Sequence, residues 1–277
     1  MARRFGYLGP PGTFSEQAAL SFDAAAELVP LPSNAAVVAA VAAGSVDAGV
    51  VPIENSLEGG VTDTLDALLQ AEQVFISGEL VLPVEQLLIA GPGLRIEDVA
   101  VVMSHPQALA QCRAFLERRL SHARLEAALS TAAAVESAVH TPRAAAIGTR
   151  RAAELSGGAI LAEGIQDVAL NKTRFVVLGR QDRPPTGDDK TSIAFTTIHD
   201  RPGTLVDALR QLSDRAINMT RIESRPSRQD LGIYIFLIDF QGHHDDPVVA
   251  EALAAVRARS HYFRLFGSYP RFVEGVA

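Results

Sequence analysis

The sequence predicts an α/β protein in two parts, and three features of the chain support this fold class. In the first part, short apolar segments alternate with amphipathic helical segments, which is typical of helices that cover largely parallel sheets. In the second part, the expected order is β-α-β-β-α-β, the ferredoxin-like arrangement. Between them, residues 181–191 contain two prolines, a glycine and a run of charges without an apolar anchor. We therefore expect units at 1–180 and 192–277, joined by an exposed linker at 181–191.

The elements of the first part are assigned from the spacing of apolar residues and from the residues that can cap each helix. Within the expected helix 107–120, for example, Leu109, Cys112, Leu116 and Leu120 lie on one face. The expected strands cover 5–8, 48–53, 75–81, 86–90, 99–103, 125–129, 144–147 and 174–179. The expected helices cover 15–22, 34–43, 62–70, 107–120 and 132–139, with a last one that ends at Leu155.

The second part is shorter and more regular. The expected strands cover 192–198, 218–223, 232–240 and 263–269, and the expected helices cover 204–213 and 248–257. Two helices on one face of a four-stranded sheet leave the edge of that sheet available for pairing with another chain. We therefore expect this part to support dimerisation through a sheet edge.

Composition limits the function classes to which the chain can belong. Of its 277 residues, 48% are hydrophobic and 21% are charged, which is ordinary for a globular protein with a core. The net charge of −7 argues against a nucleic-acid backbone or an anionic membrane as the main partner. A single cysteine excludes an internal disulfide and favours the cytoplasm. We expect no signal peptide before the first strand, and no apolar segment has the roughly 18 residues that a membrane span needs.

Small hydroxyl and amide residues follow several strands of the first part, at the points where helices begin. They occur at 9–15, 54–56, 104–107 and 130–131. Such residues cap helices, and the free backbone N–H groups at a helix start attract anions. Since ligands of open α/β sheets bind at the carboxyl ends of the strands, the four sites together predict a carboxylate-binding cleft.

Three other kinds of site are not supported. Gly12 is followed by Thr13-Phe14-Ser15, which lacks the lysine of a phosphate-binding loop. The sequence 243–246 (HHDD) has possible metal ligands, but they are adjacent in a loop, and we interpret them as a solvated turn. Ser104 and His105 are neighbours, so they do not face each other as a nucleophile and its base. We therefore expect neither a metal nor a cofactor.

Four motifs of the first part resemble the prephenate dehydratase family in order and spacing. They are 6–15 (GYLGPPGTFS), 51–56 (VPIENS), 104–107 (SHPQ) and 171–175 (NKTRF). The second part resembles the regulatory ACT domain of that family through 201–206 (RPGTLV) and 222–226 (IESRP), although Thr204 stands where the family has alanine. Bifunctional relatives carry an N-terminal chorismate mutase, for which we expect no room before the strand at Phe5.

The resemblance implies both a fold and a reaction. The catalytic part would consist of two subdomains like type 2 periplasmic binding proteins, about 1–78 plus 160–180 and about 79–159. The family converts prephenate to phenylpyruvate, water and carbon dioxide on the way to phenylalanine. Because the ring becomes aromatic, the reaction needs no redox cofactor or metal. The catalytic residues expected by resemblance and chemistry are Thr173, Glu54, Asn55, Gln111 and Glu136.

Within this set, Thr173 would hydrogen-bond the departing hydroxyl, and Glu54 or Glu136 would be candidates for supplying a full proton. The two substrate carboxylates have different requirements, because strong cationic binding of the ring carboxylate would stabilise a charge that must disappear. We therefore expect the pyruvyl carboxylate to be held at a helix start. The substrate-binding residues expected are Thr13 or Ser104, with Arg174 at the pyruvyl end and Phe175 at the ring carboxylate.

For the second part, the resemblance implies that phenylalanine binds at a dimer interface and inhibits the enzyme. The effector residues expected are Gly203, Leu205, Val206, Asn218, Glu223, Ser224, Arg225 and Pro226. Two other interpretations remain open: a non-catalytic amino-acid sensor, and an enzyme that prefers arogenate, which has an amino group in place of the keto group. The sequence also leaves open whether the chain forms a dimer or a tetramer.

Overall fold

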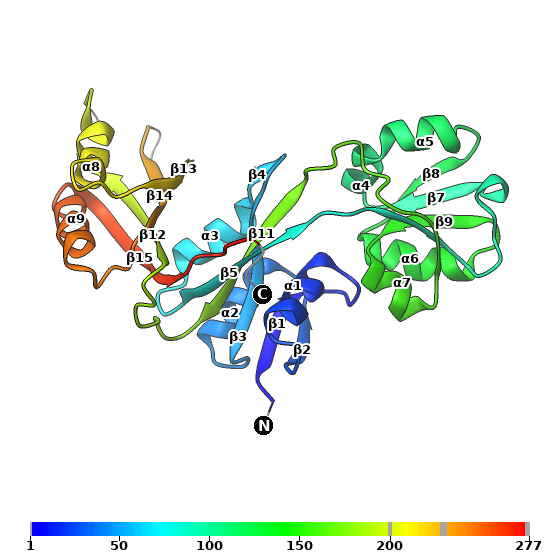
Figure 1. Ribbon diagram of the computed structural model, residues 1–277, viewed down its shortest axis with the longest axis horizontal. Coiled ribbons are helices and arrows are strands. Elements are labelled where there is room, and N and C mark those ends of the chain that lie inside the picture. Colours follow the sequence, from blue (N-terminus) through cyan, green and yellow to red (C-terminus); the bar gives the residue numbers. More distant parts are fainter. Residues whose placement is uncertain (1, 199–200, 228–231, 275–277) are drawn as a thin grey trace.

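The chain folds into two α/β lobes and a C-terminal domain, arranged in a row (Figure 1). The computed structural model describes residues 2–198, 201–227 and 232–274. Lobe 1 has the sheet order β2-β1-β3-β11-β5, with β4 paired to β3, and lobe 2 has the order β10-β6-β9-β7-β8. Lobe 1 lies in the middle of the row, so it contacts both of the other units. The predicted fold class is confirmed.

The sheet of lobe 1 contains both parallel and antiparallel strand pairs. Strand β1 pairs in parallel with β2 and β3, whereas β11 pairs antiparallel with β3 and β5. The sheet is therefore mixed and not largely parallel. Its elements are β1 (Arg4–Leu8), α1 (Phe14–Phe22), β2 (Glu27–Leu31), α2 (Asn34–Ala42), β3 (Ala48–Asn55), β4 (Gly59–Gly60), α3 (Thr62–Gln70), β5 (Phe75–Pro83) and β11 (Lys172–Gly179).

Lobe 2 repeats this mixed pattern. Strand β7 pairs in parallel with β8 and β9, and β6 pairs antiparallel with β9 and β10. Its elements are β6 (Leu87–Ala90), the 3₁₀ turn η1 (Ile96–Asp98), β7 (Val101–Ser104), α4 (Pro106–Gln111), α5 (Arg113–Arg119), β8 (Arg124–Ala127), α6 (Thr131–His140), β9 (Ala144–Gly148), α7 (Arg150–Ser156) and β10 (Ala159–Ala162). No helix in the described part of the chain is long and apolar enough to cross a bilayer.

The C-terminal domain has the predicted β-α-β-β-α-β order, and its sheet is antiparallel with the strand order β13-β14-β12-β15. Both helices lie on the face of the sheet that points away from lobe 1 (Figure 1). Its elements are β12 (Asp189–Thr197), α8 (Thr204–Ser213), β13 (Met219–Pro226), β14 (Tyr234–Gln241), α9 (Pro247–Arg257) and β15 (Ser260–Pro270).

Several predicted boundaries need correction. The predicted helix 107–120 is broken at Cys112, because the loop around Asp167 packs against it there. The Asp167 carboxylate accepts the backbone N–H of Ala114, and the backbone N–H of Asp167 donates to the carbonyl of Gln111. Strands β2 and β10 were not predicted. Lobe 1 includes β5 as far as Pro83, so the chain leaves lobe 1 after the predicted boundary at about 78. Lobe 2 includes β10, so the chain returns to lobe 1 after the predicted boundary at about 160.

The expected linker is shorter than 181–191 and partly fixed in place. Strand β12 already begins at Asp189, whose carboxylate accepts the N–H and hydroxyl of Thr186 at 2.7 Å each. The Asp182 carboxylate accepts the backbone N–H of Ser268 in β15. These bonds hold the connecting segment against the C-terminal domain, so it does not act as a free tether.

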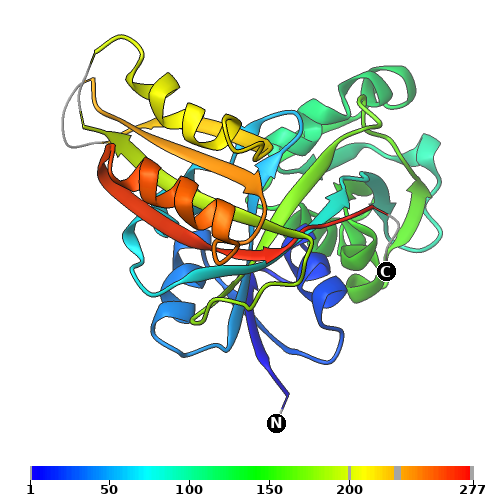
Figure 2. The same cartoon turned by 60° about the vertical axis from the view of Figure 1, so that its left-hand side comes forward.

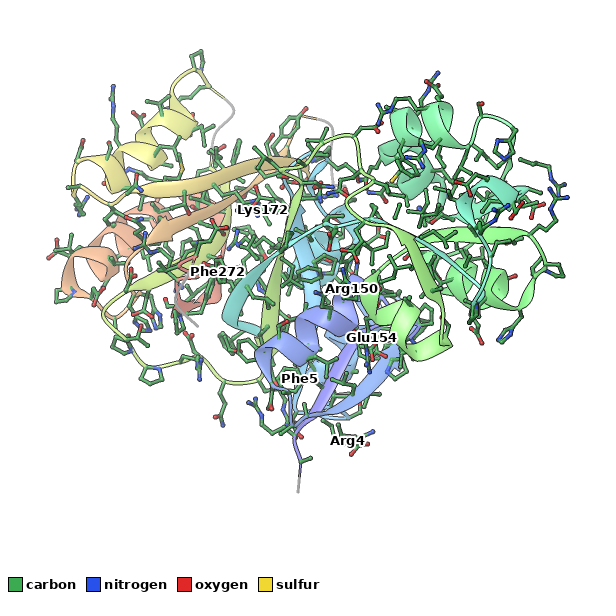
Figure 3. The ribbon with its side chains drawn as sticks, turned by 45° about the vertical axis from the view of Figure 1, so that its right-hand side comes forward. Arg4, Phe5, Arg150, Glu154, Lys172 and Phe272 are labelled. Atoms are coloured by element: carbon green, nitrogen blue, oxygen red, sulfur yellow. The ribbon has the colours of Figure 1, made fainter. Side chains whose placement is uncertain are left out.

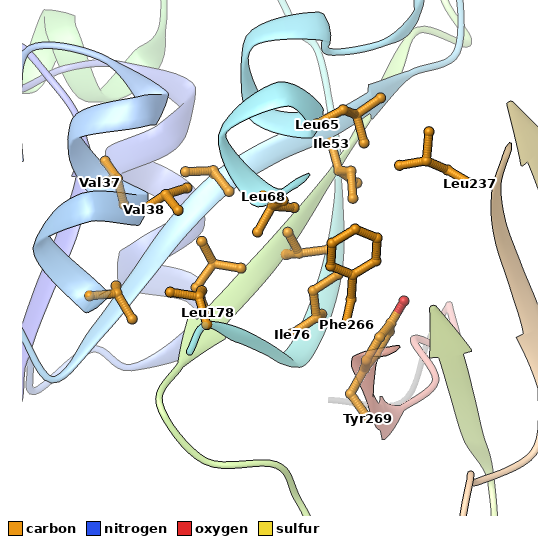
Figure 4. Packing of buried hydrophobic residues seen from close by; sticks show 14 of the residues in the cluster. Val37, Val38, Ile53, Leu65, Leu68, Ile76, Leu178, Leu237, Phe266 and Tyr269 are labelled. Atoms are coloured by element: carbon orange, nitrogen blue, oxygen red, sulfur yellow. The ribbon is translucent and has the colours of Figure 1, made fainter. Parts of the chain in front are cut away.

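Lobe 1 and the C-terminal domain share one hydrophobic core. Leu237, Phe266 and Tyr269 of the C-terminal sheet lie in the same buried cluster as Leu68 and Ile76 of lobe 1 (Figure 4). Strand β15 lies beside β5, which brings the edges of the two sheets together (Figure 2). A large apolar interface of this kind opposes independent motion of the two units.

A buried ionic cluster crosses the same interface. Arg174 of β11 donates from Nε to Glu79 at 2.7 Å, from one terminal nitrogen to Asp239 at 2.5 Å, and from the other to the hydroxyl of Tyr269 at 2.8 Å. Lys190 adds a second cation on Glu79 at 2.7 Å. Every described charge in this cluster therefore has a partner from a different strand.

The cluster sets the protonation states of its members. Burial by itself raises the pKa of Asp239, but the guanidinium groups of Arg174 and Arg221 outweigh it and hold the pKa below the ordinary value. Burial lowers the pKa of Arg174, but Asp239 and the other groups around it raise that pKa well above its usual value. Both groups are thus charged at neutral pH, and removal of one leaves the other as an unpaired buried charge.

We expect Asp239→Ala to lower the free energy of unfolding by about 3–5 kcal/mol, because it leaves the buried Arg174 guanidinium without its counter-ion. Urea denaturation at neutral pH measures this. The stabilisation from the carboxylate is present above its unfolded-state pKa and is lost as the pH falls through the lowered folded-state pKa. Asp207→Ala, which breaks an exposed pair with Arg210, is the control and should cost less than about 1 kcal/mol. Equal effects of the two substitutions would contradict the assignment.

Candidate active site

A cleft with a volume of about 600 Å³ lies between the two lobes. Residues from both lobes form its walls, and the chain crosses beside it in the segments that follow β5 and precede β11. Its lining residues are Leu8, Gly9, Pro10, Thr13, Phe14, Pro32, Asn55, Val84, Gln86, His105, Gln107, Ala108, Gln111, Leu129, Ser130, Thr131, Ala133, Asn171 and Thr173.

The lobes contact each other on one side of the cleft through the loop before α1. The hydroxyl of Thr149 donates to the carbonyl of Gly12 at 2.6 Å, and Arg151 of α7 pairs with the buried Glu16 of α1 at 3.3 Å. Figure 3 shows α7, marked by Arg150 and Glu154, next to α1. Gly12 has a φ of +90°, and a Cβ there would lie 3.0 Å from that of Ala152, so this close contact requires glycine.

A second contact between the lobes comes from the turn between β3 and β4. The Glu58 carboxylate accepts a hydrogen bond from Gln107 of α4 at 2.5 Å, and another from Gln111 at 3.4 Å. Glu58 was not among the predicted site residues. It joins the two walls of the cleft, so its position depends on how far the lobes are closed.

Asn55, at the end of β3, fixes the orientation of the polar groups on the lobe 1 wall. Its Oδ1 accepts the backbone N–H groups of Leu57 at 2.9 Å and Glu58 at 3.2 Å. Backbone N–H groups only donate, so this contact identifies the oxygen of the Asn55 amide. Its Nδ2 therefore donates, to the hydroxyl of Thr173 and to Oδ1 of Asn171, each at 2.9 Å.

This arrangement makes Thr173 a hydrogen-bond donor toward a ligand. The β3–β11 register places Thr173 opposite Asn55, and its oxygen accepts the Asn55 amide. The hydroxyl hydrogen is not used in that bond, so it is available to a group inside the cleft.

Two glutamines continue the polar wall into lobe 2. Gln111 donates from Nε2 to Glu58, so its Oε1 faces Gln86 and accepts the Gln86 amide at 3.2 Å. This leaves Oε1 of Gln86 buried without a partner, although the Gln86 side chain lines the cleft. An unpaired buried carbonyl of this kind is suited to a ligand donor.

Two helix starts and a histidine face the cleft from opposite sides. Thr13 caps α1 and Ser130 caps α6, and each accepts an N–H of its own helix. The Thr13 hydroxyl also donates to the carbonyl of Leu8, so Thr13 offers a ligand the start of α1 and not its hydroxyl hydrogen. Nδ1 of His105 accepts the N–H of Gln107, which leaves Nε2 as the protonated nitrogen of the neutral ring.

The cleft lining is almost free of charge. Among the described residues that form it, none is lysine, arginine, aspartate or glutamate. Ligand binding in the cleft therefore depends on neutral hydrogen-bond donors and on helix starts.

Comparisons with known proteins agree with the resemblance seen in the sequence. Residues 5–183 match the family model of prephenate dehydratase, and residues 192–258 match that of the ACT domain. A prephenate dehydratase from Mycobacterium sp. (strain JLS) is 42% identical over 281 residues, which cover 96% of this chain and 89% of that protein. The chain belongs to the prephenate dehydratase family.

Two solved structures are similar over nearly the whole chain. A prephenate dehydratase from Arthrobacter aurescens, in complex with L-Phe, has a TM-score of 0.89 and 38% identity, and the match covers 97% of this chain and 90% of that one. A protein described as GqqA, a novel type of quorum quenching acylase, has a TM-score of 0.88 and 31% identity, with 98% of each chain covered.

The structure brings four residues expected from the prephenate dehydratase resemblance to the cleft: Thr173, Asn55, Gln111 and Thr13. Five further lining residues were not named individually among the expected site residues, although all except Gln86 lie in segments that the sequence analysis singled out: Gln86, His105, Ser130, Thr131 and Asn171. The helix-start pattern at 104–107 and 130–131 contained a signal for three of them, whereas Gln86 has no local motif and reaches the cleft only through the path of the chain after β5.

The positions expected for Glu54, Arg174 and Phe175 are wrong. For Glu54 and Arg174 the reason is that neighbouring residues of a strand point to opposite faces. Glu54 lies on the face opposite Asn55, 3.5 Å from Arg174, and Arg174 points into the ionic cluster under the C-terminal domain. Phe175 returns to the face of Thr173, but deeper in lobe 1, where it packs in the core with Phe5 beneath α1.

The positions expected for Ser104 and Glu136 are also wrong. Ser104 is fully buried, and its hydroxyl donates to the carbonyl of Ile147 at 2.7 Å, so His105 and not Ser104 reaches the cleft. Glu136 is exposed on α6, outside the cleft lining.

The expected effector residues are distributed over three places in the ACT domain. Leu205 lines a pocket of about 430 Å³ at the start of α8, where Gly203 has a φ of +90°, while Val206 is exposed beside it. Glu223 contacts Gly60 of β4, and Arg225 pairs with Asp66 of α3 at 2.9 Å. The other three are exposed along β13 or next to it: Asn218, Ser224 and Pro226.

The predicted solvated turn at 243–246 is partly wrong, because His243 is only 1% exposed. Nδ1 of His243 accepts the N–H of Asp245 at 3.0 Å, and Nε2 lies 2.8 Å from the carbonyl of Arg183. Ligand atoms of His243, His244 and Asp245 do lie close together, but both ring nitrogens of His243 already have partners, one within the turn and one in the linker. The arrangement is that of a structural anchor.

We expect Asn55→Asp to reduce the turnover of prephenate by about 10²–10³-fold while the protein still folds. The aspartate keeps the acceptor for Leu57 and Glu58 but accepts the Thr173 hydroxyl hydrogen, which then no longer points at the ligand. Steady-state kinetics measure the loss, and the thermal midpoint checks folding. Turnover at the wild-type rate would contradict the orientation assigned to Thr173.

Proposed function

We propose that this chain converts prephenate to phenylpyruvate, water and carbon dioxide. Residues up to about 180 would form the catalytic part, and the ACT domain that follows the linker would control it. The observation that carries this proposal is the Thr173 hydroxyl, which Asn55 holds as a free donor in a nearly uncharged cleft. A location in the cytoplasm is part of the proposal and is supported by the single, buried and unpaired Cys112.

The reaction requires two bonds to break. As the bond between the ring and its carboxylate breaks, carbon dioxide leaves, and the electron pair of that bond enters the ring. The bond between the opposite ring carbon and the hydroxyl oxygen breaks with its electron pair on the oxygen, and one proton taken up from the solvent pool converts the hydroxide to water. The hydrogen bond from Thr173 strengthens as negative charge develops on that oxygen, so it lowers the barrier.

The uncharged lining suits the loss of carbon dioxide. A fixed cation beside the ring carboxylate would stabilise the charge that the reaction removes. The pyruvyl carboxylate keeps its charge, and we assign it to the helix starts at Thr13 and Ser130, with Nε2 of His105 as a further donor. Because Glu54 and Glu136 lie outside the cleft, we assign the proton of the product water to solvent.

A second candidate substrate is arogenate, and one observation favours it. Oε1 of Gln86 is a buried acceptor without a partner, and the amino group of arogenate is a donor that prephenate lacks. Parallel assays with the two substrates decide between them. A higher kcat/KM for prephenate supports the first assignment, and a higher value for arogenate replaces it.

Feedback inhibition by phenylalanine is the second half of the proposal. It is supported by the L-Phe complex of the Arthrobacter aurescens relative and by the pocket beside Leu205, where Arg201 can pair with a carboxylate and Phe236 is apolar. β13 is an edge strand with Met219 and Ile222 exposed, so we propose that two copies pair there. Feedback requires that phenylalanine binds the two states with different affinities.

The path from the ACT domain to the cleft is short. Any side chain at Gly60 would overlap the Glu223 carboxylate, so Glu223 is in direct contact with β4. The turn that leads into β4 carries Glu58 and is bonded to Asn55. We propose that a shift of Glu223 moves this turn and thereby changes the closure of the cleft.

Thr173→Val should reduce the formation of phenylpyruvate by about 10²-fold or more, because it removes the donor to the leaving oxygen and keeps the shape of the side chain. Thr173→Ser, which keeps the hydroxyl, should retain part of the activity and is the matched control. The assay follows phenylpyruvate by its absorbance. A fully active valine variant would exclude this role of Thr173.

Glu223→Ala should raise the phenylalanine concentration needed for half inhibition at least about tenfold, because it removes the carboxylate that contacts β4, while kcat without phenylalanine stays within about twofold. Glu251→Ala, in an exposed position on α9, is the control and should leave inhibition unchanged. Unaltered inhibition in the Glu223 variant would show that this contact does not transmit the signal.

A further inference from the structure

We propose that Asn171 is a second catalytic hydrogen-bond donor, which acts beside Thr173 on the hydroxyl oxygen that leaves the substrate. This inference rests on the proposed function, because it assigns a group to the same bond cleavage. It arises from a polar atom of Asn171 that the folded chain leaves without a partner.

Asn171 is buried, with 1% of its surface exposed, and it lines the cleft. Its Nδ2 is shielded from solvent and makes no hydrogen bond within the protein. A buried amide group without a partner costs roughly 1–3 kcal/mol, so a structural role alone gives no reason for it. A ligand that accepts a hydrogen bond would supply the missing partner.

The orientation of the Asn171 amide follows from the bonds around it. Two backbone N–H groups identify Oδ1 of Asn55, so Nδ2 of Asn55 must donate. The Asn171 atom that faces this nitrogen at 2.9 Å is therefore the oxygen, which also accepts the hydroxyl of Ser56 at 3.4 Å. A flipped amide would set two NH₂ groups against each other. The free atom of Asn171 is thus the nitrogen, a donor.

Thr173 and Asn171 are close enough together to donate hydrogen bonds to the same group of a ligand. They are two residues apart in an extended segment, which puts both side chains on the same face. Their oxygens accept hydrogen bonds from the same nitrogen of Asn55, so the two side chains stand next to each other on the cleft wall. The backbone carbonyl of Asn171 accepts the N–H of Val84 at 2.9 Å, which fixes the segment to the other crossing.

Two donors match the charge that develops in the reaction. When the bond from the ring to oxygen breaks, both electrons go to the oxygen, and hydroxide accepts hydrogen bonds more strongly than the alcohol from which it forms. Donors that gain strength in this way raise kcat more than they lower KM. Neither Thr173 nor Asn171 gives up its proton, and the reaction takes up one proton from the solvent pool to complete the product water.

The test is Asn171→Asp, which keeps the shape of the side chain and the oxygen that Asn55 contacts but replaces the free NH₂ with an acceptor. We expect kcat for prephenate to fall by about 10²–10³-fold, with KM within about threefold of the wild-type value. The matched control is Ser56→Ala, which removes the hydroxyl that donates to Oδ1 of Asn171 and accepts the backbone N–H of Lys172, and leaves the Asn171 nitrogen in place. This control should keep kcat within about threefold.

The pH dependence separates a donor from a structural residue. A protonated aspartic acid at position 171 can donate again, so the ratio of the variant's kcat to that of the wild type should rise as the pH falls. A position that only supports the fold gives a ratio that does not rise. Asn171→Ala, which adds no charge, should lose kcat to a similar extent and gives a second result if the aspartate variant does not fold.

The possible outcomes distinguish this inference from the function on which it rests. Wild-type turnover of prephenate, loss of activity in Thr173→Val and full kcat in both Asn171 variants would overturn the role of Asn171 alone. A change in KM without a change in kcat would overturn it as well, since Asn171 would then hold a group whose charge does not change. A folded wild-type protein that does not turn over prephenate would remove both proposals.

Discussion

The whole molecule depends on a single strand, β11, and on the alternation of its side chains. This strand returns from lobe 2 and pairs with β3 on one side and β5 on the other, so it lies inside the sheet of lobe 1. Thr173 faces the cleft, Arg174 faces the C-terminal domain and Phe175 enters the core under α1. Three consecutive residues thus serve the cleft, the domain interface and the core. A shift of one residue in register would exchange these roles.

The two faces of lobe 1 differ sharply in charge. On the face toward the C-terminal domain, Arg174, Glu79 and Asp239 form a buried cluster with Lys190. On the opposite face, the described residues that line the cleft include no lysine, arginine, aspartate or glutamate. Fixed amide and hydroxyl groups stabilise a developing charge without the reorganisation that water would need. A cation at the same place would oppose the loss of carbon dioxide.

The elements of the fold were largely predictable, and the errors have physical causes. The helices at Thr62–Gln70 and Thr204–Ser213 agree with the predicted ranges, because the apolar residues in each segment recur at helical spacing. The break at Cys112 was not predictable from its own segment, since it depends on Asp167, a residue distant in the sequence. β10 was missed for a similar reason, because its one described pairing partner in the sheet, β6, is distant in the sequence.

For the site, the sequence by itself determined which residue types were available and, through the resemblance, that Thr173, Asn55 and Gln111 belonged together. The alternation of side chains along β11 was already implicit in the sequence and would have excluded Arg174 from the cleft. Only the tertiary structure decided the orientation of the amides, because backbone donors from the turn after β3 identify the oxygen of Asn55. That one contact fixes Thr173 as a donor and leaves the nitrogen of Asn171 free. Such hydrogen-bond directions depend on groups brought together from distant parts of the chain, so no local pattern contains them.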